Sequence, residues 1–483
     1  MAGIGFELKK LFKNKGIIQN AKAYSYSTII TIGPSAICIM LVLGMQYILG
    51  LYGVGLSQRL VVTSAIVYAY ILSQIVTSGF TMIVTRFVSD KIYNKEFEQI
   101  LPSMYGTIII CLPIVSILSF LFYMNSPLDF VFKLFAYCFN IEMTMVWIFM
   151  TYVSALKNYV KIIKAYIIGA IMGILALFLF LHFQILTPIV AALVSVNIVF
   201  LVVLFVLTMS IVSYLQIKKN KGKCFLFLQC FDEYASLFFI NFFYTVGLYI
   251  HNIIYWMGDK SIEIEDTYYM APFYDSPSFF AFLSMLPIMI FFVVRAETSF
   301  YERYRRYYKL IIKNGRFSEI EVAKKNMVDT LWDEIRNMME LQILVAIAFF
   351  LAMFMFFSRL GISEESKGIF EILLLGCFAT SIMYVVVLLL LYFDDRKGAL
   401  WIVSTFLVGG VVATLVCVYY ELDGFGFFIA SITALVLGLI RINHYLNNIN
   451  YYTFSARPVI YKHKVGLFER LVNKIYKYEA KDN

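Results

Sequence analysis

The sequence predicts an all-α integral membrane protein with twelve transmembrane helices, and two observations lead to this class. The 483 residues are 61% hydrophobic and 15% charged, whereas a soluble domain carries roughly 25% charged residues. Twelve apolar runs also approach or exceed the ~20 residues that a helix needs to cross hydrocarbon. These runs cover approximately residues 26–52, 60–88, 101–124, 130–155, 162–182, 186–214, 234–256, 268–294, 338–358, 369–393, 398–420 and 425–445.

The distribution of lysine and arginine predicts the orientation of these helices. If the N-terminus is inside, all but five of the 40 basic residues fall in inward segments. Inward loops of membrane proteins carry an excess of Lys and Arg, so we expect both termini in the cytoplasm and the protein in the cytoplasmic (inner) membrane. The net charge of +9 then reflects topology, and we expect no nucleic-acid partner. The five outward residues are Arg59, Lys133, Lys260, Arg359 and Lys367.

The order of the segments predicts two lobes. The opening stretch MAGIGFELKKLFKNKGIIQNAK has apolar residues at helical spacing with lysines between them, which predicts an amphipathic helix lying on anionic lipid. The basic loop LQIKKNKGKCF then separates six apolar runs from six, an arrangement that many secondary transporters use around a central cavity. The expected parts are the N-terminal helix at 1–25, an N-lobe at 26–220, a C-lobe at 221–448 that includes a cytoplasmic loop at 295–337, and a basic cytoplasmic tail at 449–483.

The most informative stretch is YDSPSFFAFLSMLPIMIFFVVRAETSFYERYRRYY, residues 274–308. Its apolar run carries Asp275 inside one end and is interrupted by Pro277 and Pro287. Proline in a spanning helix frees a carbonyl that a neighbour or water must satisfy. An acid inside a span usually faces a bundle interior or a hydrated cavity. Two interpretations fit: a helix that lines a transport path, or a kinked packing helix with a paired aspartate.

Other polar residues also interrupt apolar runs. Glu142 lies near the middle of the fourth run, where a carboxylate either lines a hydrated path or makes a structural hydrogen bond. His251 and Asp275 lie at similar distances from the outer ends of adjacent runs, so we predict that they pair. The candidate translocation path comprises Asp275, Glu142, His251, Asn241, Asn252, Pro277, Arg295 and Glu297.

Charged groups gather at the predicted inner ends of the helices. Arg86 and Asp90 are four residues apart and can meet on one helical face. The motif YFDDRKGAL places two acids beside an arginine, and such groups act as gates, as docking sites or simply as interfacial charges. The candidate gate or docking residues are Arg86, Asp90, Asp394, Asp395, Arg396, Arg303, Arg305 and Arg306.

The sequence contains no indication of an enzyme. The seven cysteines form no CxxC motif and no Cys/His spacing typical of zinc, so we expect no metal site and no cofactor. No segment is long enough for a separate soluble catalytic domain.

Several long motifs resemble the Pel exopolysaccharide transporter family, PelG: MAGIGFELKKLF, TIGPS, TRFVSDKIY, WIFMTYVSALKNY, APFYDSPSFFAF with RAETSFYERYRRYY, and YFDDRKGAL. The resemblance implies a flippase-like fold of the multidrug/oligosaccharidyl-lipid/polysaccharide class, with two six-helix lobes around a central cavity. It implies transport of nascent Pel polysaccharide across the cytoplasmic membrane for the biofilm matrix. The implied partners are a cytoplasmic glycosyltransferase similar to PelF and membrane proteins similar to PelD and PelE.

Two alternatives remain open beside polysaccharide transport. The same fold would suit a lipid-linked oligosaccharide flippase or a cation-coupled antiporter. A membrane-embedded glycosyltransferase is disfavoured, because such an enzyme would need acids in an early external loop and the first one, GLYGVGLSQR, has none.

Overall fold

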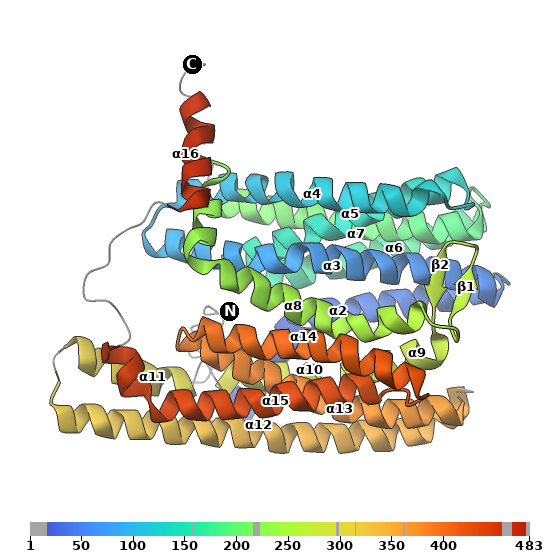
Figure 1. The fold of residues 1–483 in the computed structure, drawn as a ribbon. Coiled ribbons are helices and arrows are strands. Elements are labelled where there is room, and N and C mark those ends of the chain that lie inside the picture. The colour runs from blue at the N-terminus through green and yellow to red at the C-terminus, as the bar shows by residue number, and fades with distance from the viewer. Residues whose placement is uncertain are drawn as a thin grey trace. The chain divides into compact units, whose positions relative to one another are not determined.

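The computed structural model describes residues 17–156, 159–215, 223–295, 299–313, 315–360, 363–455 and 466–479. Helices dominate these residues (Figure 1). They are α2 (Ile17–Leu51), α3 (Leu56–Tyr93), η1 (Phe97–Gln99), α4 (Ile100–Met124), α5 (Phe130–Ala155), α6 (Tyr159–His182), α7 (Pro188–Leu215), η2 (Leu226–Gln229), α8 (Cys230–Trp256), α9 (Pro272–Leu283), α10 (Leu286–Arg295), α11 (Tyr301–Ile312), α12 (Phe317–Leu360), α13 (Glu364–Tyr392), α14 (Arg396–Tyr419), α15 (Phe425–Asn447), the π-helical turn η4 (Tyr451–Ser455) and α16 (Leu467–Glu479). The strands are β1 (Ile262–Ile264) and β2 (Tyr268–Met270).

Twelve segments of the described chain are long and apolar enough to cross a membrane. Ten of them lie in one α-helix each, with η1 or η2 added to two of these. The first is the part of α2 from Ile32 onward, and the remaining one is formed by α9 and α10 together. The predicted all-α fold class with twelve spans is therefore confirmed. The short α11 and α16 are additional helices, and the predicted amphipathic helix at 1–25 lies largely outside the described residues.

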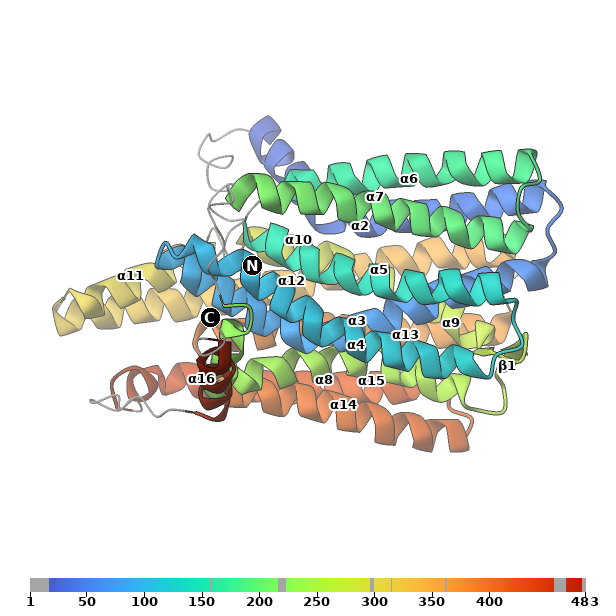
Figure 2. The same cartoon turned by 90° about the horizontal axis from the view of Figure 1, so that it is seen from above.

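The chain packs into two units. Unit 1 holds the described residues within Met1–Ile32, Ile250–Gly258 and Ala271–Tyr461, and unit 2 holds those within Gly33–Tyr249, Asp259–Met270 and Lys462–Asn483. In unit 1, α13 packs against α9, α12, α14 and α15; in unit 2, α5 and α7 pack against each other and against α3 (Figure 2). The predicted lobes at 26–220 and 221–448 stay a prediction, and packing places residues 223–249 in unit 2.

A small β hairpin, β1 and β2, was not expected from the sequence. Its strands pair in antiparallel register, with Glu263 opposite Tyr269. The edge of β2 is held in unit 2 by Tyr68, whose hydroxyl donates to the carbonyl of Tyr269 (2.7 Å) and accepts from its N–H (3.1 Å). Strands of only three residues carry too little alternation of polar and apolar residues to be recognised in a sequence. The hydroxyl that pairs with the strand edge comes from a helix about 200 residues away.

Candidate functional site

One membrane span of unit 1 is broken in its middle. The segment Pro272–Arg295 is long and apolar enough to cross a membrane, but it consists of two helices, α9 ending at Leu283 and α10 beginning at Leu286. The break exposes backbone groups that have no helical partner, which hydrocarbon does not tolerate unless protein satisfies them. Gln342 of α12 supplies a donor: its Nε2 lies 3.1 Å from the carbonyl oxygen of Ser284, and both side chains are fully buried.

A hydrogen bond from another helix also replaces the one that is lost at Pro277, inside α9. Because proline has no N–H, it cannot donate to the carbonyl of Phe273, four residues earlier. The hydroxyl of Ser366, in the first turn of α13, donates to that carbonyl at 3.0 Å. Pro287, in the first turn of α10, needs no such partner, because N–H groups at the start of a helix are not used within it. The two prolines therefore mark this discontinuous span correctly.

Asp275 lies in the first turn of α9 and gathers hydrogen-bond donors from three residues of unit 1. Its carboxylate accepts from Nδ2 of Asn252 (2.9 Å), from Nε1 of Trp256 (2.9 Å to each oxygen) and from the backbone N–H of Ala271 (2.9 Å). The N-terminal position on α9 also places the carboxylate at the positive end of the helix dipole. Ser278 extends the network, with its hydroxyl 3.3 Å from Oδ1 of Asn252.

The predicted His251–Asp275 pair is wrong, because the two residues have other partners. Nδ1 of His251 lies 2.8 Å from the hydroxyl of Tyr274, and the ring of Tyr274 stacks on that of Tyr255 with centroids 3.8 Å apart. Residues four apart share a helical face, so 251 and 255 face Tyr274 while 252 and 256 face Asp275. Their similar depth in the membrane correctly predicted that Asp275 and His251 lie near each other. Which side chains form hydrogen bonds depends instead on the direction in which each residue points from its helix.

The remaining predicted path residues are dispersed. Glu142 on α5 is 7% exposed, and its Oε2 has no hydrogen-bond partner among the described residues. Asn241 on α8 donates to the carbonyl of Ser78 at 2.6 Å, a contact between two helices of unit 2. Arg295, at the end of α10, forms an ion pair with Glu334 of α12 (3.8 Å). Glu297 lies outside the described residues.

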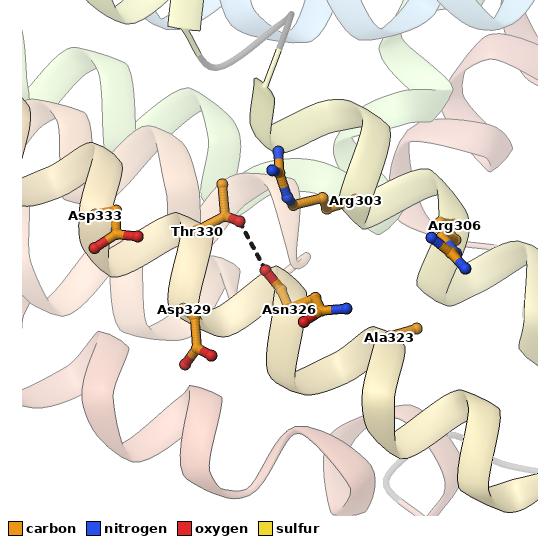
Figure 3. Close-up of a pocket in the computed structure, with 7 residues that line it drawn as sticks. All are labelled: Arg303, Arg306, Ala323, Asn326, Asp329, Thr330 and Asp333. Carbon is orange, nitrogen blue, oxygen red and sulfur yellow. Dashed lines mark hydrogen bonds between the residues drawn. The ribbon is translucent and has the colours of Figure 1, made fainter.

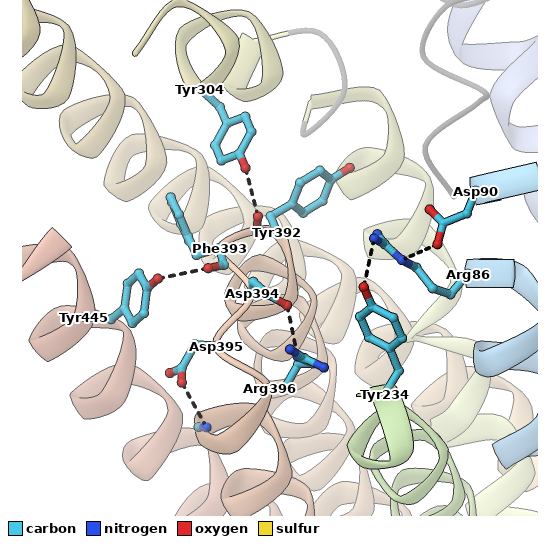
Figure 4. Close-up of polar contacts among 11 residues, drawn as sticks. Arg86, Asp90, Tyr234, Tyr304, Tyr392, Phe393, Asp394, Asp395, Arg396 and Tyr445 are labelled. Atoms are coloured by element: carbon cyan, nitrogen blue, oxygen red, sulfur yellow. Dashed lines mark hydrogen bonds and ion pairs between the residues drawn. The ribbon is translucent and has the colours of Figure 1, made fainter. Parts of the chain in front are cut away.

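At the opposite end of α13, a second polar cluster joins four helices of unit 1 (Figure 4). The last carbonyls of α13 are capped by tyrosines: Tyr304 of α11 donates to Tyr392 (3.1 Å) and Tyr445 of α15 donates to Phe393 (2.9 Å). Asp395 accepts the N–H of Gly398 (3.2 Å) and so caps α14. The same carboxylate receives Nε and Nη2 of Arg441 from α15 at 2.7 and 2.9 Å.

The other predicted gate residues make more exposed contacts. Asp394 pairs with Arg396 at 3.0 Å, beside the buried Asp395. In unit 2, Arg86 pairs with Asp90 at 3.1 Å as the four-residue spacing predicts, and one of its guanidinium nitrogens lies 3.3 Å from the hydroxyl of Tyr234 (Figure 4).

Of the three candidate gate or docking arginines within the 295–337 segment, two line a pocket of about 400 Å³ (Figure 3). Arg303 and Arg306 extend into it from α11, while Arg305 is exposed outside it. The opposite wall belongs to α12 and contains the acids Asp329 and Asp333. Ala323, Asn326 and Thr330 complete the lining.

The sequence interpretation missed several residues that organise these clusters. Gln342 and Arg441 both lie inside predicted apolar runs, where a polar or charged side chain is a signal in itself. Trp256 and Tyr274 gave no comparable signal, because aromatic residues are frequent at the ends of membrane spans.

The break in the Pro272–Arg295 span leads to a prediction. Gln342→Met keeps a side chain of similar size but removes the donor to Ser284, so the free energy of unfolding should fall by about 1–3 kcal/mol. Thermal unfolding in detergent measures this, and Glu340→Met, at an exposed position two residues earlier on α12, is the control. Equal melting temperatures for wild type and Gln342→Met would show that the break does not need this donor.

Comparison with solved structures identifies the fold. The chain is similar to the Vibrio cholerae MATE transporter VcmN in its bent form (TM-score 0.61, 13% identity, covering 93% of this chain and 99% of that one). It is similar to the eukaryotic MATE transporter AtDTX14 (TM-score 0.61, 10% identity, 96% and 100% covered) and to the MATE transporter ClbM in complex with Rb⁺ (TM-score 0.57, 10% identity, 88% and 96% covered). The chain is thus a multi-pass membrane protein with the twelve-helix fold of MATE transporters.

The chain belongs to the PelG family, described as "Putative exopolysaccharide Exporter (EPS-E)", whose model matches residues 1–454. The resemblance drawn from the sequence motifs is confirmed. No curated protein matches the chain.

Proposed function

We propose that this protein moves a Pel-type exopolysaccharide across the cytoplasmic membrane, as the membrane component of a synthase-like complex. The observation that carries the proposal is the PelG family match over residues 1–454, on a fold shared with MATE transporters. In this proposal the protein is a conduit or carrier without enzymatic activity, both termini are cytoplasmic, and the exported polymer contributes to a biofilm matrix.

The broken span α9–α10 supports a transport role. Discontinuous helices in transporters bring backbone groups and helix ends to the substrate site near the middle of the membrane. Here Ser284 marks the break, and Oε1 of the buried Gln342 has no hydrogen-bond partner among the described residues. A polysaccharide presents hydroxyl groups that donate to such acceptors. We propose that Asp275, with its neighbours Asn252 and Trp256, orders the end of this span and contacts the polymer there.

The α11–α12 pocket supports a docking role for the segment 295–337. Arg303 donates to the carbonyl of Ser299 (3.1 Å) and Asp333 pairs with Arg336, so neither needs the opposite wall of the pocket as its partner. Positive and negative side chains on facing walls suit a protein surface of mixed charge. We propose that a PelF-like glycosyltransferase docks here, and that PelD- and PelE-like membrane proteins and anionic lipid complete the complex.

A second candidate function is cation-coupled transport, either of a lipid-linked oligosaccharide or of a small molecule. Two observations favour it: the likeness to ClbM, solved with Rb⁺, and the buried Glu142, whose Oε2 has no hydrogen-bond partner in the described chain. An unpaired carboxylate inside a membrane span is a candidate for proton or cation binding.

Deletion of the gene in its host, followed by complementation with the wild-type chain or with Asp275→Ala, tests the proposed function. We expect extracellular Pel-type polymer to be lost on deletion and restored by the wild type, while glycosyltransferase activity in the cytoplasm is unchanged. Polymer outside the cells at wild-type levels after deletion would contradict export. Efflux from reconstituted vesicles that depends on a proton or sodium gradient, without any effect on polymer, would favour the second candidate.

A further inference from the structure

The last helix, α16, lies beyond residue 454, where the family match ends. It belongs to unit 2 and packs on η2, the turn with which the membrane-spanning segment Leu226–Trp256 begins. Figure 1 shows α16 running across the direction of α4 and α5 of the same unit, and Figure 2 views it nearly along its axis. A helix that packs where a span begins and runs across the direction of the spans has the orientation expected of a helix parallel to the membrane surface.

The contacts that hold α16 in this position are specific. Both carboxylate oxygens of Asp232 cap its N-terminus, accepting the N–H groups of Phe468 (3.0 Å) and Glu469 (2.7 Å). Gly466 leaves room for this contact, because a Cβ atom at this position would overlap the carboxylate of Asp232 and displace it. Further along the helix, the backbone N–H of Phe225 donates to the hydroxyl of Tyr476 at 2.9 Å.

Only part of the apolar surface of α16 is used in this packing. The side that carries Val472, 1% exposed, and Phe468 contacts unit 2, with Phe468 near the ring of Phe231. The adjoining side carries Leu467 and Leu471, which are 79% and 48% exposed. Arg470 and Lys474, four residues apart, are exposed beyond these leucines. An apolar strip edged by basic residues is typical of helices that lie in the headgroup region of a bilayer.

We propose that α16 is a membrane-surface helix that binds anionic lipid. Leu467 and Leu471 enter the boundary between headgroups and acyl chains, and Arg470 and Lys474 contact lipid phosphates. Three observations select a lipid over a protein partner: the helix lies at the level where the span begins, its axis crosses the spans, and the exposed leucines adjoin exposed cations. Positive side chains next to an apolar strip match the charge of an anionic leaflet.

Photo-crosslinking of the full chain in vesicles of phosphatidylcholine and phosphatidylglycerol tests the proposal. A benzoylphenylalanine placed at Leu471 should label tracer lipid several-fold more than the same group at Asn473, an exposed position on the polar side of α16. Equal lipid labelling from the two positions, or labelling of protein alone from Leu471, would overturn the proposal.

The charge requirement is tested separately. Arg470→Gln and Lys474→Gln should each reduce the preference of the Leu471 adduct for phosphatidylglycerol over phosphatidylcholine, by about fivefold for a charge at the membrane surface. Both side chains are exposed, so the variants should fold as the wild type does. An unchanged lipid preference in the double variant would exclude anionic lipid as the ligand.

Discussion

Replacing Asp275 by asparagine is expected to destabilise unit 1 and to abolish polymer export. The carboxylate has four acceptor sites and receives N–H groups from Asn252, Trp256 and Ala271. An asparagine side chain offers one oxygen and an NH₂ group, so at least one of these donors would face another donor. Each donor left unsatisfied in a buried place costs about 1–3 kcal/mol. Melting curves in detergent, read with a thiol-reactive dye whose signal rises as the buried cysteines, Cys377 among them, become exposed, measure the loss.

Two further variants test whether the effect of Asp275→Asn comes from the hydrogen bonds that Asp275 accepts or from the loss of a charge alone. Asp259→Asn changes an exposed acid in the segment between α8 and the hairpin and should leave both stability and export unchanged. Trp256→Phe removes one N–H while keeping an aromatic ring, so it should lower the stability by less than Asp275→Asn does. If Asp275→Asn melts at the wild-type temperature, the cluster is not what holds the start of α9.

The membrane spans were predictable because their signal is local. Each apolar run is long enough to be recognised as a membrane span from its own residues. The alternation of basic and non-basic loops is consistent with a count of twelve spans. Pro277 and Pro287 likewise indicated an interrupted helix from within the segment that they interrupt. The side chains that donate hydrogen bonds to its free carbonyls could not be identified in the same way. Ser366 and Gln342 belong to other helices, α13 and α12, that are distant in the sequence.

The candidate site was predictable in location but not in pairing. Asp275, His251 and Asn252 do gather at one end of unit 1, as their similar depth suggested. Which of them meet depends on the rotation of α8 about its axis, since neighbouring residues on a helix point about 100° apart. The alternation of polar and apolar residues is too weak in an almost uniformly apolar helix to define that rotation. The pairing of Asp395 with Arg441 rather than with the adjacent Arg396 was not predictable either, because Arg441 comes from α15, 46 residues away in the chain.

Arg441→Ala is expected to lower the free energy of unfolding by about 3 kcal/mol, the lower limit for breaking a buried ion pair, because Arg441 itself is partly exposed. The loss arises from Asp395, whose 7% exposed carboxylate would keep only the N–H of Gly398. Arg396→Ala is the matched control: its pair with Asp394 lies next in the chain but is more exposed, and such pairs contribute about 0–1 kcal/mol.

A double variant distinguishes attraction between Asp395 and Arg441 from the cost of an isolated charge. Replacing both residues by leucine removes the buried carboxylate together with its partner, and such exchanges are often close to neutral. We therefore expect the double variant to melt nearer to the wild type than Arg441→Ala does. Gly398→Ala tests the same pair without changing either charged residue. The added Cβ atom would overlap both Asp395 and Arg441 and should push them apart. Wild-type stability in Arg441→Ala and Gly398→Ala alike would mean that the ends of α13, α14 and α15 are held by the tyrosine caps alone.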